Sequence, residues 1–293
     1  MSQVNFIEEN LNNLGELDRH DFRYLSENVE QFYLNVFNEK SFNQLRNLFK
    51  LISYEDFPRD FDLTKVQIKY INGKICFINK YNQVCYEENG LLYITPILSK
   101  VDGNTYKNIQ KDILNSYKYA INRSNDSPYW KTKSYSSDYY NKCDNYTFEE
   151  YCAISIKDNQ IINIIKAINI NNIKDLDLIM QTIALGGKLI QSYKVDFYKY
   201  IKYGFTPISV CKWEDDKAPK NWIELNNFKN NDWKNQSDDN FEYKRQDIIF
   251  YIYTGNQSYI NYNDWLNTVN YSNNYEEAKA KRDHIYYKLL EGN

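Results

Sequence analysis

The sequence predicts an α+β protein in two parts, with a helical and β-meander N-terminal region ahead of a mixed sheet that is flanked by helices. Three observations predict this class. The first fifty residues place apolar side chains at helical spacing, residues 66–98 are rich in β-branched and aromatic residues, and residues 151–253 alternate strand-like and helix-like patterns. With 42% hydrophobic and 26% charged residues among 293, the chain has enough apolar surface for a folded core.

Two amphipathic helices are predicted within the first fifty residues. The segment SENVEQFYLNVF, residues 26–37, carries apolar side chains three and four positions apart behind Ser26, a typical helix N-cap. The segment SFNQLRNLFKLI, residues 41–52, begins with Ser41 and Gln44 at the spacing of a capping box. Apolar stripes of this kind most often face a protein core.

Residues 66–98 predict a meander of three antiparallel strands. Turn signals interrupt this run at Asn72-Gly73, at Tyr81-Asn82 and at Asn89-Gly90, and Asn-Gly between strand-like segments is the strongest short hairpin signal. An amphipathic helix is predicted next, over residues 105–122.

Composition divides the chain at residues 126–145, which are polar and rich in Ser, Asn and Tyr. We expect residues 1–125 to form the N-terminal region, whose role the sequence does not reveal, and 126–145 to form a linker or long loop. Residues 146–255 are expected to form the mixed-sheet domain, and residues 256–293 a C-terminal helical extension.

The second half of the chain predicts strands and helices in alternation. An Asp158-Asn159 turn separates two strands, acidic residues open the next helix, and Gly186-Gly187 closes it. Such an order builds a mixed sheet with helices on its faces. In chain order, the predicted elements are strands within 150–168, a helix over 174–187, a strand over 188–193, a helix over 195–204, strands over 205–213 and 247–255, and a helix over 275–292.

The residue counts exclude several classes of site and partner. The chain has five cysteines, no CxxC motif and only two histidines, so we expect no metal site. We expect the cysteines to be free thiols in a reducing cytosol. Cys76 and Cys85 nevertheless have the spacing to face each other across a hairpin. A net charge of −3 without dense basic runs predicts no specific nucleic-acid binding. No apolar run is long enough to span a membrane and the N-terminus lacks a signal-peptide pattern, so we expect no membrane contact and a cytoplasmic location.

Tyrosine is unusually abundant, with 29 residues, and Asn, Ile and Lys are plentiful as well. Two interpretations stay open. The codon bias of an AT-rich genome produces this composition, and a stacking surface for sugars or bases would also require it.

The segment YKYIKYGF, residues 198–205, predicts a helix that Gly204 ends in a left-handed conformation before a strand begins at Phe205. Its Tyr200-x-x-Tyr203-Gly204-Phe205 pattern resembles a signature of GNAT-superfamily acyltransferases. The resemblance covers roughly residues 146–255 and is nearest to a GNAT-like group common in phages and mobile elements. Its further motifs are Gly186-Gly187, the loop residues Ala218, Pro219 and Trp222, and Asp247 at the start of a hydrophobic strand.

The resemblance implies a GNAT-like mixed sheet in which strand 188–193 parts from its neighbour, with acyl-CoA, here acetyl-CoA, in the gap. It also implies a general acid at Tyr200 that protonates the leaving thiolate, with Tyr198 in that role if the register shifts. No general base is identified. The family pattern has glycines in the pyrophosphate loop, whereas this chain has none there. The residues that would stand in are Asn171, Asn172, Ile173 and Lys174.

Two functions remain open from the sequence. The first is an acyl-CoA-dependent N-acyltransferase that modifies an amine of a small molecule or a protein. The second is a catalytically inactive GNAT-like scaffold that acts as a virion or host-interaction protein, with residues 1–125 contacting a protein partner, in the host cytoplasm or in a virion. The Tyr-Gly-Phe series favours the first function and the glycine-free loop favours the second, because Asp175 and Asp177 repel a pyrophosphate even as they complement the helix dipole.

Overall fold

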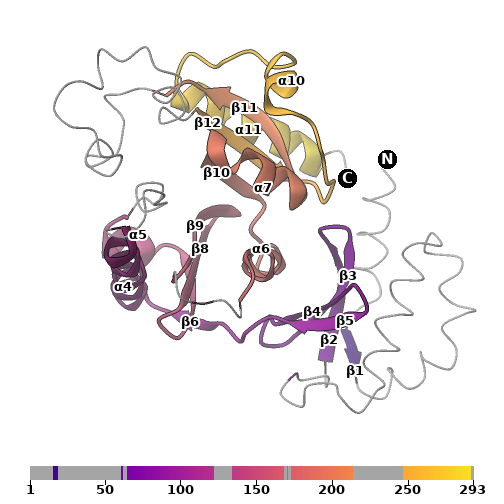
Figure 1. The fold of residues 1–293 in the computed structure, drawn as a ribbon, viewed down its shortest axis with the longest axis vertical. Coiled ribbons are helices and arrows are strands. Elements are labelled where there is room, and N and C mark those ends of the chain that lie inside the picture. The colour runs from indigo at the N-terminus through magenta and orange to yellow at the C-terminus, as the bar shows by residue number, and fades with distance from the viewer. Residues whose placement is uncertain are drawn as a thin grey trace, which may run out of the picture. The chain divides into compact units, whose positions relative to one another are not determined.

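The computed structural model describes residues 16–18, 61, 65–121, 134–167, 170, 173–213 and 247–291 (Figure 1). The predicted helices over 26–37 and 41–52 therefore lie outside the described residues. By its internal contacts the chain divides into two units. Unit 1 comprises residues 1–99 and 171–186, and unit 2 comprises residues 100–170 and 187–293.

Unit 1 contains a five-stranded antiparallel sheet in the order β1-β2-β3-β4-β5. The turns fall at the predicted dipeptides, with φ of 52° at Asn72 and 54° at Asn89, a backbone region that Asn and Gly adopt most readily. Residues 66–98 form four strands rather than the predicted three, because each of the three turns separates two strands. The bounds are β1 Glu16–Asp18, β2 Lys65–Ile71, β3 Lys74–Asn79, β4 Val84–Glu88 and β5 Leu91–Ile94.

Helix α6, Asp175–Ala184, packs against β4 and β2 of this sheet. The hydroxyl of the buried Tyr86 donates a hydrogen bond of 2.8 Å to Asp177 Oδ1. The side-chain amide of Gln181, also buried, donates to the carbonyl of Pro96 at 2.7 Å. These two bonds join the helix to strands that precede it by many residues, and they satisfy polar groups that burial would otherwise penalise.

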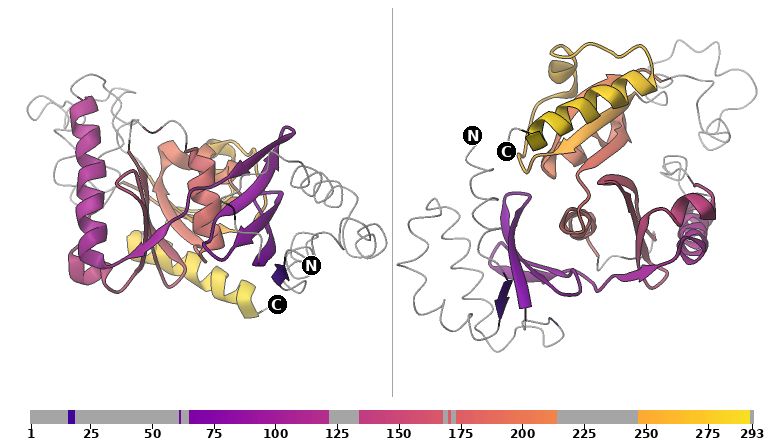
Figure 2. Two further views of the ribbon diagram at one scale, coloured as in Figure 1. Left: turned by 90° about the horizontal axis from the view of Figure 1, so that it is seen from below. Right: turned by 180° about the vertical axis from the view of Figure 1, so that it is seen from behind.

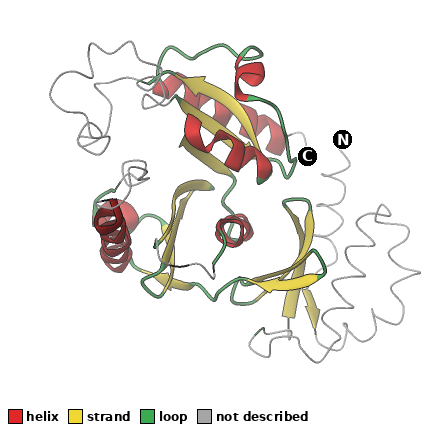
Figure 3. Cartoon of the chain, in the orientation of Figure 1, coloured by secondary structure: helices red, strands yellow, loops and turns green. Residues whose placement is uncertain are grey.

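Unit 2 contains a seven-stranded mixed sheet in the order β11-β12-β10-β9-β8-β7-β6, with helices packed on it (Figure 3). Together with unit 1 this confirms the predicted α+β class, a mixed sheet flanked by helices preceded by a meander. The strands are β6 Ser99–Val101, β7 Asp144–Phe148, β8 Cys152–Lys157, β9 Gln160–Lys166, β10 Leu189–Tyr193, β11 Phe205–Cys211 and β12 Ile248–Tyr253. The helices are α4 Gly103–Ile121, α5 Ser137–Tyr140, the short 3-10 helix η2 Lys194–Asp196, α7 Phe197–Lys202, α10 Tyr262–Leu266 and α11 Tyr275–Glu291.

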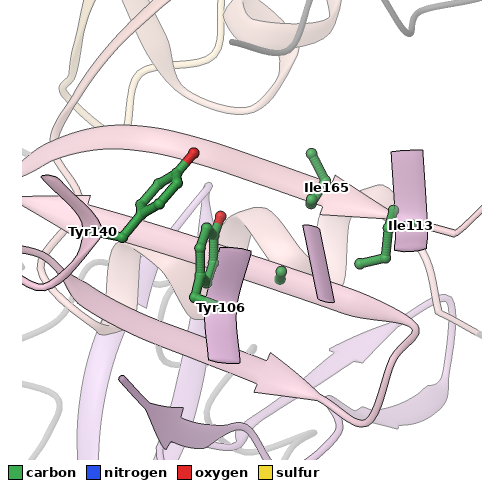
Figure 4. Close-up of a cluster of buried hydrophobic side chains, with 5 residues drawn as sticks. Tyr106, Ile113, Tyr140 and Ile165 are labelled. Atoms are coloured by element: carbon green, nitrogen blue, oxygen red, sulfur yellow. The ribbon is translucent and has the colours of Figure 1, made fainter. Parts of the chain in front are cut away.

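Two apolar layers hold the helices of unit 2 on the sheet. Tyr106 and Ile113 of α4 and Tyr140 of α5 pack against Ala153 and Ile165 of the sheet (Figure 4). Helix α11, in yellow in Figure 2, lies along β11 and β12. Two of its buried residues reach the strands: Tyr286 meets Leu189 and Ile252, and Ala278 meets Cys211 and Phe250.

Gly204 joins α7 to β11 with φ of 81°, which confirms the predicted left-handed helix end. A Cβ at this position would lie 3.1 Å from the ring of Tyr253 and 3.2 Å from the backbone of Gly255. Glycine is therefore required here both by backbone conformation and by crowding.

Candidate functional site

Strands β9 and β10 are parallel neighbours that share a single residue pair, Leu189 with Gln160. At this pair the Leu189 N–H donates to the carbonyl of Asn159 at 3.0 Å. The described pairing between the two strands then stops, and Figure 1 shows them running apart toward their carboxyl ends. We call this feature the β9–β10 divergence. It is the kind of feature that the resemblance implies for strand 188–193.

The register of β10 with β12 determines which peptide groups of β10 face the divergence. The carbonyl of Lys188 accepts a hydrogen bond from the Tyr253 N–H, and the Lys194 N–H donates to the carbonyl of Asp247. The backbone groups of the even-numbered residues from 188 to 194 therefore bond to β12. The peptide groups of Gln191 and Tyr193 alternate with these and point toward β9.

Strand β9 carries a bulge on the facing edge. Ser155 of β8 pairs with Asn163 and Ile156 pairs with Ile161, which leaves Ile162 as an extra residue. Beyond the bulge, the peptide groups of Ile164 and Lys166 point toward β10, because Ala167 bonds to Tyr151 on the other side. The two edges thus present backbone donors and acceptors to each other without strand pairing, and such edges bind extended amide-containing chains.

Tyr200 lies on α7, half-buried beside β12. Its ring centroid is 5.7 Å from that of Phe205 and 5.6 Å from that of Tyr251. The Ser192 hydroxyl of β10 donates to Tyr251 Oη at 3.4 Å. Burial raises the pKa of Tyr251 well above the ordinary value, and the neighbouring Tyr200 and Asp196 raise it further. Tyr251 therefore stays protonated at neutral pH.

Tyr198 points away from this group, because residues two apart on a helix lie on nearly opposite faces. It is 54% exposed, its hydroxyl accepts a hydrogen bond of 3.4 Å from the Tyr262 N–H, and its ring meets Phe197 edge-on. The structure therefore brings Tyr200, but not Tyr198, next to Phe205 of β11 and Tyr251 of β12.

The residues predicted to hold the cofactor pyrophosphate fall in unit 1, at the start of α6. Asn171 and Asn172 lie outside the described residues. Ile173 is buried at 4% exposure. Lys174 is engaged through its ammonium group, which lies 3.2 Å from Glu88 and 3.5 Å from the ring centroid of Tyr93.

At the N-terminus of α6, a carboxylate of the same helix already bonds a backbone N–H. Asp177 Oδ2 accepts a hydrogen bond of 2.8 Å from the Lys174 N–H, one of the donors that a pyrophosphate at a helix N-terminus would use. Asp175 and Asp177 also bring two negative charges to this turn. The residues at the start of α6 therefore do not fit the pyrophosphate of acyl-CoA.

A group of half-buried tyrosines lies on the sheet face that α11 covers, and sequence reasoning did not identify it. Tyr275 of α11 donates a hydrogen bond to Gln191 Oε1 of β10, and Tyr135 stacks on Tyr139 at 4.3 Å between ring centroids. Burial first, and then Tyr275 and Tyr135, raise the pKa of Tyr193 to about 12. Period-two alternation in the segment LIQSY, which puts Gln191 and Tyr193 on one face, was the available signal.

The described residues contain neither a cluster of metal ligands nor a membrane-spanning helix. No group of three or more His, Cys, Asp or Glu among them is arranged to hold a metal ion, and all five cysteines have free thiols. None of the described helices is both long and apolar enough to cross a membrane. No family model, curated protein or solved structure matches the chain.

Proposed function

We propose that unit 2 is a GNAT-like N-acyltransferase that transfers an acyl group from acyl-CoA to an amine of a small molecule or a protein. The observation that carries the proposal is the β9–β10 divergence beside α7, where two parallel strands share only the Leu189–Gln160 pair. This geometry supports the function because strand edges that are not paired with each other can hold an extended amide-bearing ligand.

The chain's own groups have separate roles in this proposal. The peptide groups of Gln191 and Ile164 would hydrogen-bond the amides of a bound cofactor arm and fix its position between the strands. When bound, acetyl-CoA supplies the acyl group as a thioester. Tyr200 would supply the proton that the departing sulfur takes up as the bond between the acyl carbon and the sulfur breaks, and the amine that forms the new bond would lose its proton to water.

Substitution of Tyr200 by phenylalanine tests the proposal. Acetyl-CoA is expected to raise the melting temperature of both the wild type and Tyr200→Phe, whereas acetyl transfer to an amine panel falls at least tenfold in the variant, because only the proton donor is lost. Tyr198→Phe, on the opposite side of the same helix, is the matched control and retains activity. Absence of heat on titrating the wild type with millimolar acetyl-CoA would contradict the proposal.

A second candidate function rests on the N-terminus of α6. The bond from Lys174 to Asp177 and the contacts of Lys174 with Glu88 and Tyr93 occupy groups that a pyrophosphate would need. This favours an inactive GNAT-like scaffold that serves as a virion or host-interaction protein through residues 1–125. It predicts no acetyl-CoA-induced shift in melting temperature, together with a stable protein partner whose binding survives Tyr200→Phe.

A further inference from the structure

The turn between β8 and β9 lies at the closed end of the β9–β10 divergence and bonds to the start of β10. Asp158 and Asn159 form this turn with φ of 49° and 62°. The carbonyl of Asn159 accepts hydrogen bonds from the Lys188 N–H at 2.9 Å and from the Leu189 N–H at 3.0 Å. The side-chain amide of Gln160 donates to the carbonyl of Leu189 at 3.3 Å. These bonds join the two strands at one place, and two strands joined at one place can rotate about it.

A further bond reaches the same turn from α11. The side-chain amide of Asn159 donates to Tyr286 Oη at 3.0 Å. Tyr286 is 9% exposed, and its ring packs against Leu189 of β10 and Ile252 of β12. The Tyr286 side chain therefore connects the first residue of β10 to the turn that precedes β9.

Helix α11 is itself fixed to the strands on the β10 side of the divergence. The Ser209 hydroxyl of β11 donates a hydrogen bond of 2.6 Å to the carbonyl of Ala278. The hydroxyl of Tyr275 donates to Gln191 Oε1 of β10. Because α11 is held at these points, its bond to Asn159 joins strands β10, β11 and β12 to β9.

Two attachments at different places fix the angle between two strands, whereas one attachment leaves the angle free. The pairing of Leu189 with Gln160 lies in the sheet, and the bond of Asn159 to Tyr286 lies on the face that α11 covers. With both attachments, the width of the β9–β10 divergence is set before a ligand arrives. A site that is already in its bound shape loses less free energy to ordering when it binds.

We propose that Asn159 and Tyr286 are positioning residues, whose hydrogen bond holds β9 and β10 at the angle that receives the amide-bearing arm of acyl-CoA. This inference rests on the proposed acyltransferase function. The two residues would act through β10, whose Gln191 peptide group faces the divergence, rather than by touching the reacting atoms. Helix α11 lies outside residues 146–255, and in this proposal it determines the width of a site that those residues form.

Calorimetric titration of the full chain with CoA tests the inference. Tyr286→Phe removes the hydroxyl and keeps the ring, whereas Asn159→Gly removes the side-chain amide and keeps a residue that tolerates positive φ. Each variant is expected to weaken CoA binding about threefold, because one hydrogen bond is lost and fewer molecules hold the competent angle. The double variant should weaken binding no further than either single variant, since both substitutions remove the same bond.

The same turn and the same helix supply the matched controls. Asp158→Gly changes the other residue with positive φ in the turn, and Asp158 is exposed. Tyr287→Phe changes the neighbour of Tyr286, which is 62% exposed. Both controls are expected to leave CoA affinity unchanged.

Amide exchange followed by NMR distinguishes positioning from a general loss of stability. Tyr286→Phe should speed exchange at Leu189, whose N–H bonds to Asn159, and leave exchange at Ile190, whose N–H bonds to β12, as it is in the wild type. A purely structural role for the bond would speed exchange at both residues. That result, or an unchanged rate at Leu189, would overturn the inference.

The two measurements separate failure of this inference from failure of the proposed function. CoA affinity that is equal in the wild type, Tyr286→Phe and Asn159→Gly overturns the inference and leaves the acyltransferase proposal standing. If the wild type does not bind CoA, the acyltransferase proposal falls and exchange decides the inference. Faster exchange at Leu189 alone then supports a bond that fixes the angle between the strands.

Discussion

Leu189 pairs with Gln160, and in the described part of the chain this is the one pair that joins β10 to β9. Beyond it, the peptide groups of β10 alternate between those that bond to β12 and those that face β9. The proposed binding of an acyl-CoA arm depends on this alternation, and it can be measured directly.

Amide hydrogen exchange should differ between neighbouring residues of β10. The amides of Ile190 and Ser192 donate to β12 and are expected to exchange slowly, whereas that of Gln191 faces the β9–β10 divergence and exchanges faster. Exchange followed by NMR checks this pattern residue by residue. Saturating CoA should slow exchange at Gln191 selectively. Exchange at Gln191 as slow as at Ile190 and Ser192 without ligand would mean that β9 and β10 are fully paired.

Alanine at Gly204 should destabilise unit 2 by about 2 kcal/mol, since a residue with a Cβ is strained at positive φ and also meets Tyr253 and Gly255. Gly90 is the matched control, because it has a similar φ of 78° but no neighbouring atom within 4 Å of the place that a Cβ would take. Gly90→Ala is expected to cost about 1 kcal/mol, the backbone part alone. Urea denaturation of both variants measures the difference, and equal losses would show that crowding at Gly204 contributes nothing.

Removing the hydroxyl of Tyr86 should destabilise unit 1. Tyr86→Phe deletes the 2.8 Å hydrogen bond to the buried carboxylate of Asp177, and a lost bond to a charged group of this kind costs about 2 kcal/mol. Tyr81→Phe is a suitable control, since Tyr81 is 44% exposed. Denaturant unfolding monitored on both variants gives the comparison. An unchanged stability in Tyr86→Phe would mean that water replaces the phenol at Asp177.

The tyrosines beside β10 predict a loss of stability at high pH. Burial, with neighbouring tyrosines, raises the pKa of Tyr139 and that of Tyr193 to about 12. An unfolded tyrosine has a pKa of about 10, so the stabilising effect is complete below about pH 10 and is lost as the pH rises from about 10 to about 12. Chemical denaturation across this range should show a falling free energy of unfolding. Tyr193→Phe makes the slope shallower, and a slope that stays the same would contradict the assignment.

Local signals predicted much of the fold. Asn72-Gly73 and Asp158-Asn159 both form the expected turns with positive φ, because few other residues tolerate that conformation. The strand and helix order of the second half also follows the sequence patterns, including the end of α7 at Gly204. The insertion of β12 between β10 and β11 could not be predicted, because strand order is set by long-range packing rather than by periodicity.

Less of the candidate site than of the fold could be predicted from the sequence. The Tyr200 to Phe205 spacing predicted the helix that carries Tyr200, but no sequence pattern indicates that Asp177 caps its own helix or that Lys174 is held by Glu88 and Tyr93. Lys174 lies 86 positions from Glu88 and 81 from Tyr93, so these two contacts form only when α6 packs on the meander. The bond between Lys174 and Asp177 lies within one helical turn.

The hydrogen bond between Tyr86 and Asp177 spans 91 positions of the chain, and it has a consequence for synthesis. As the protein leaves the ribosome, the strands of unit 1 emerge long before the helix that covers them. The nascent sheet must keep its apolar face exposed while most of β7, β8 and β9 are translated, and closing so distant a contact is slow. A ribosome-bound chaperone is therefore expected to engage the nascent chain most strongly between the emergence of β5 and that of α6.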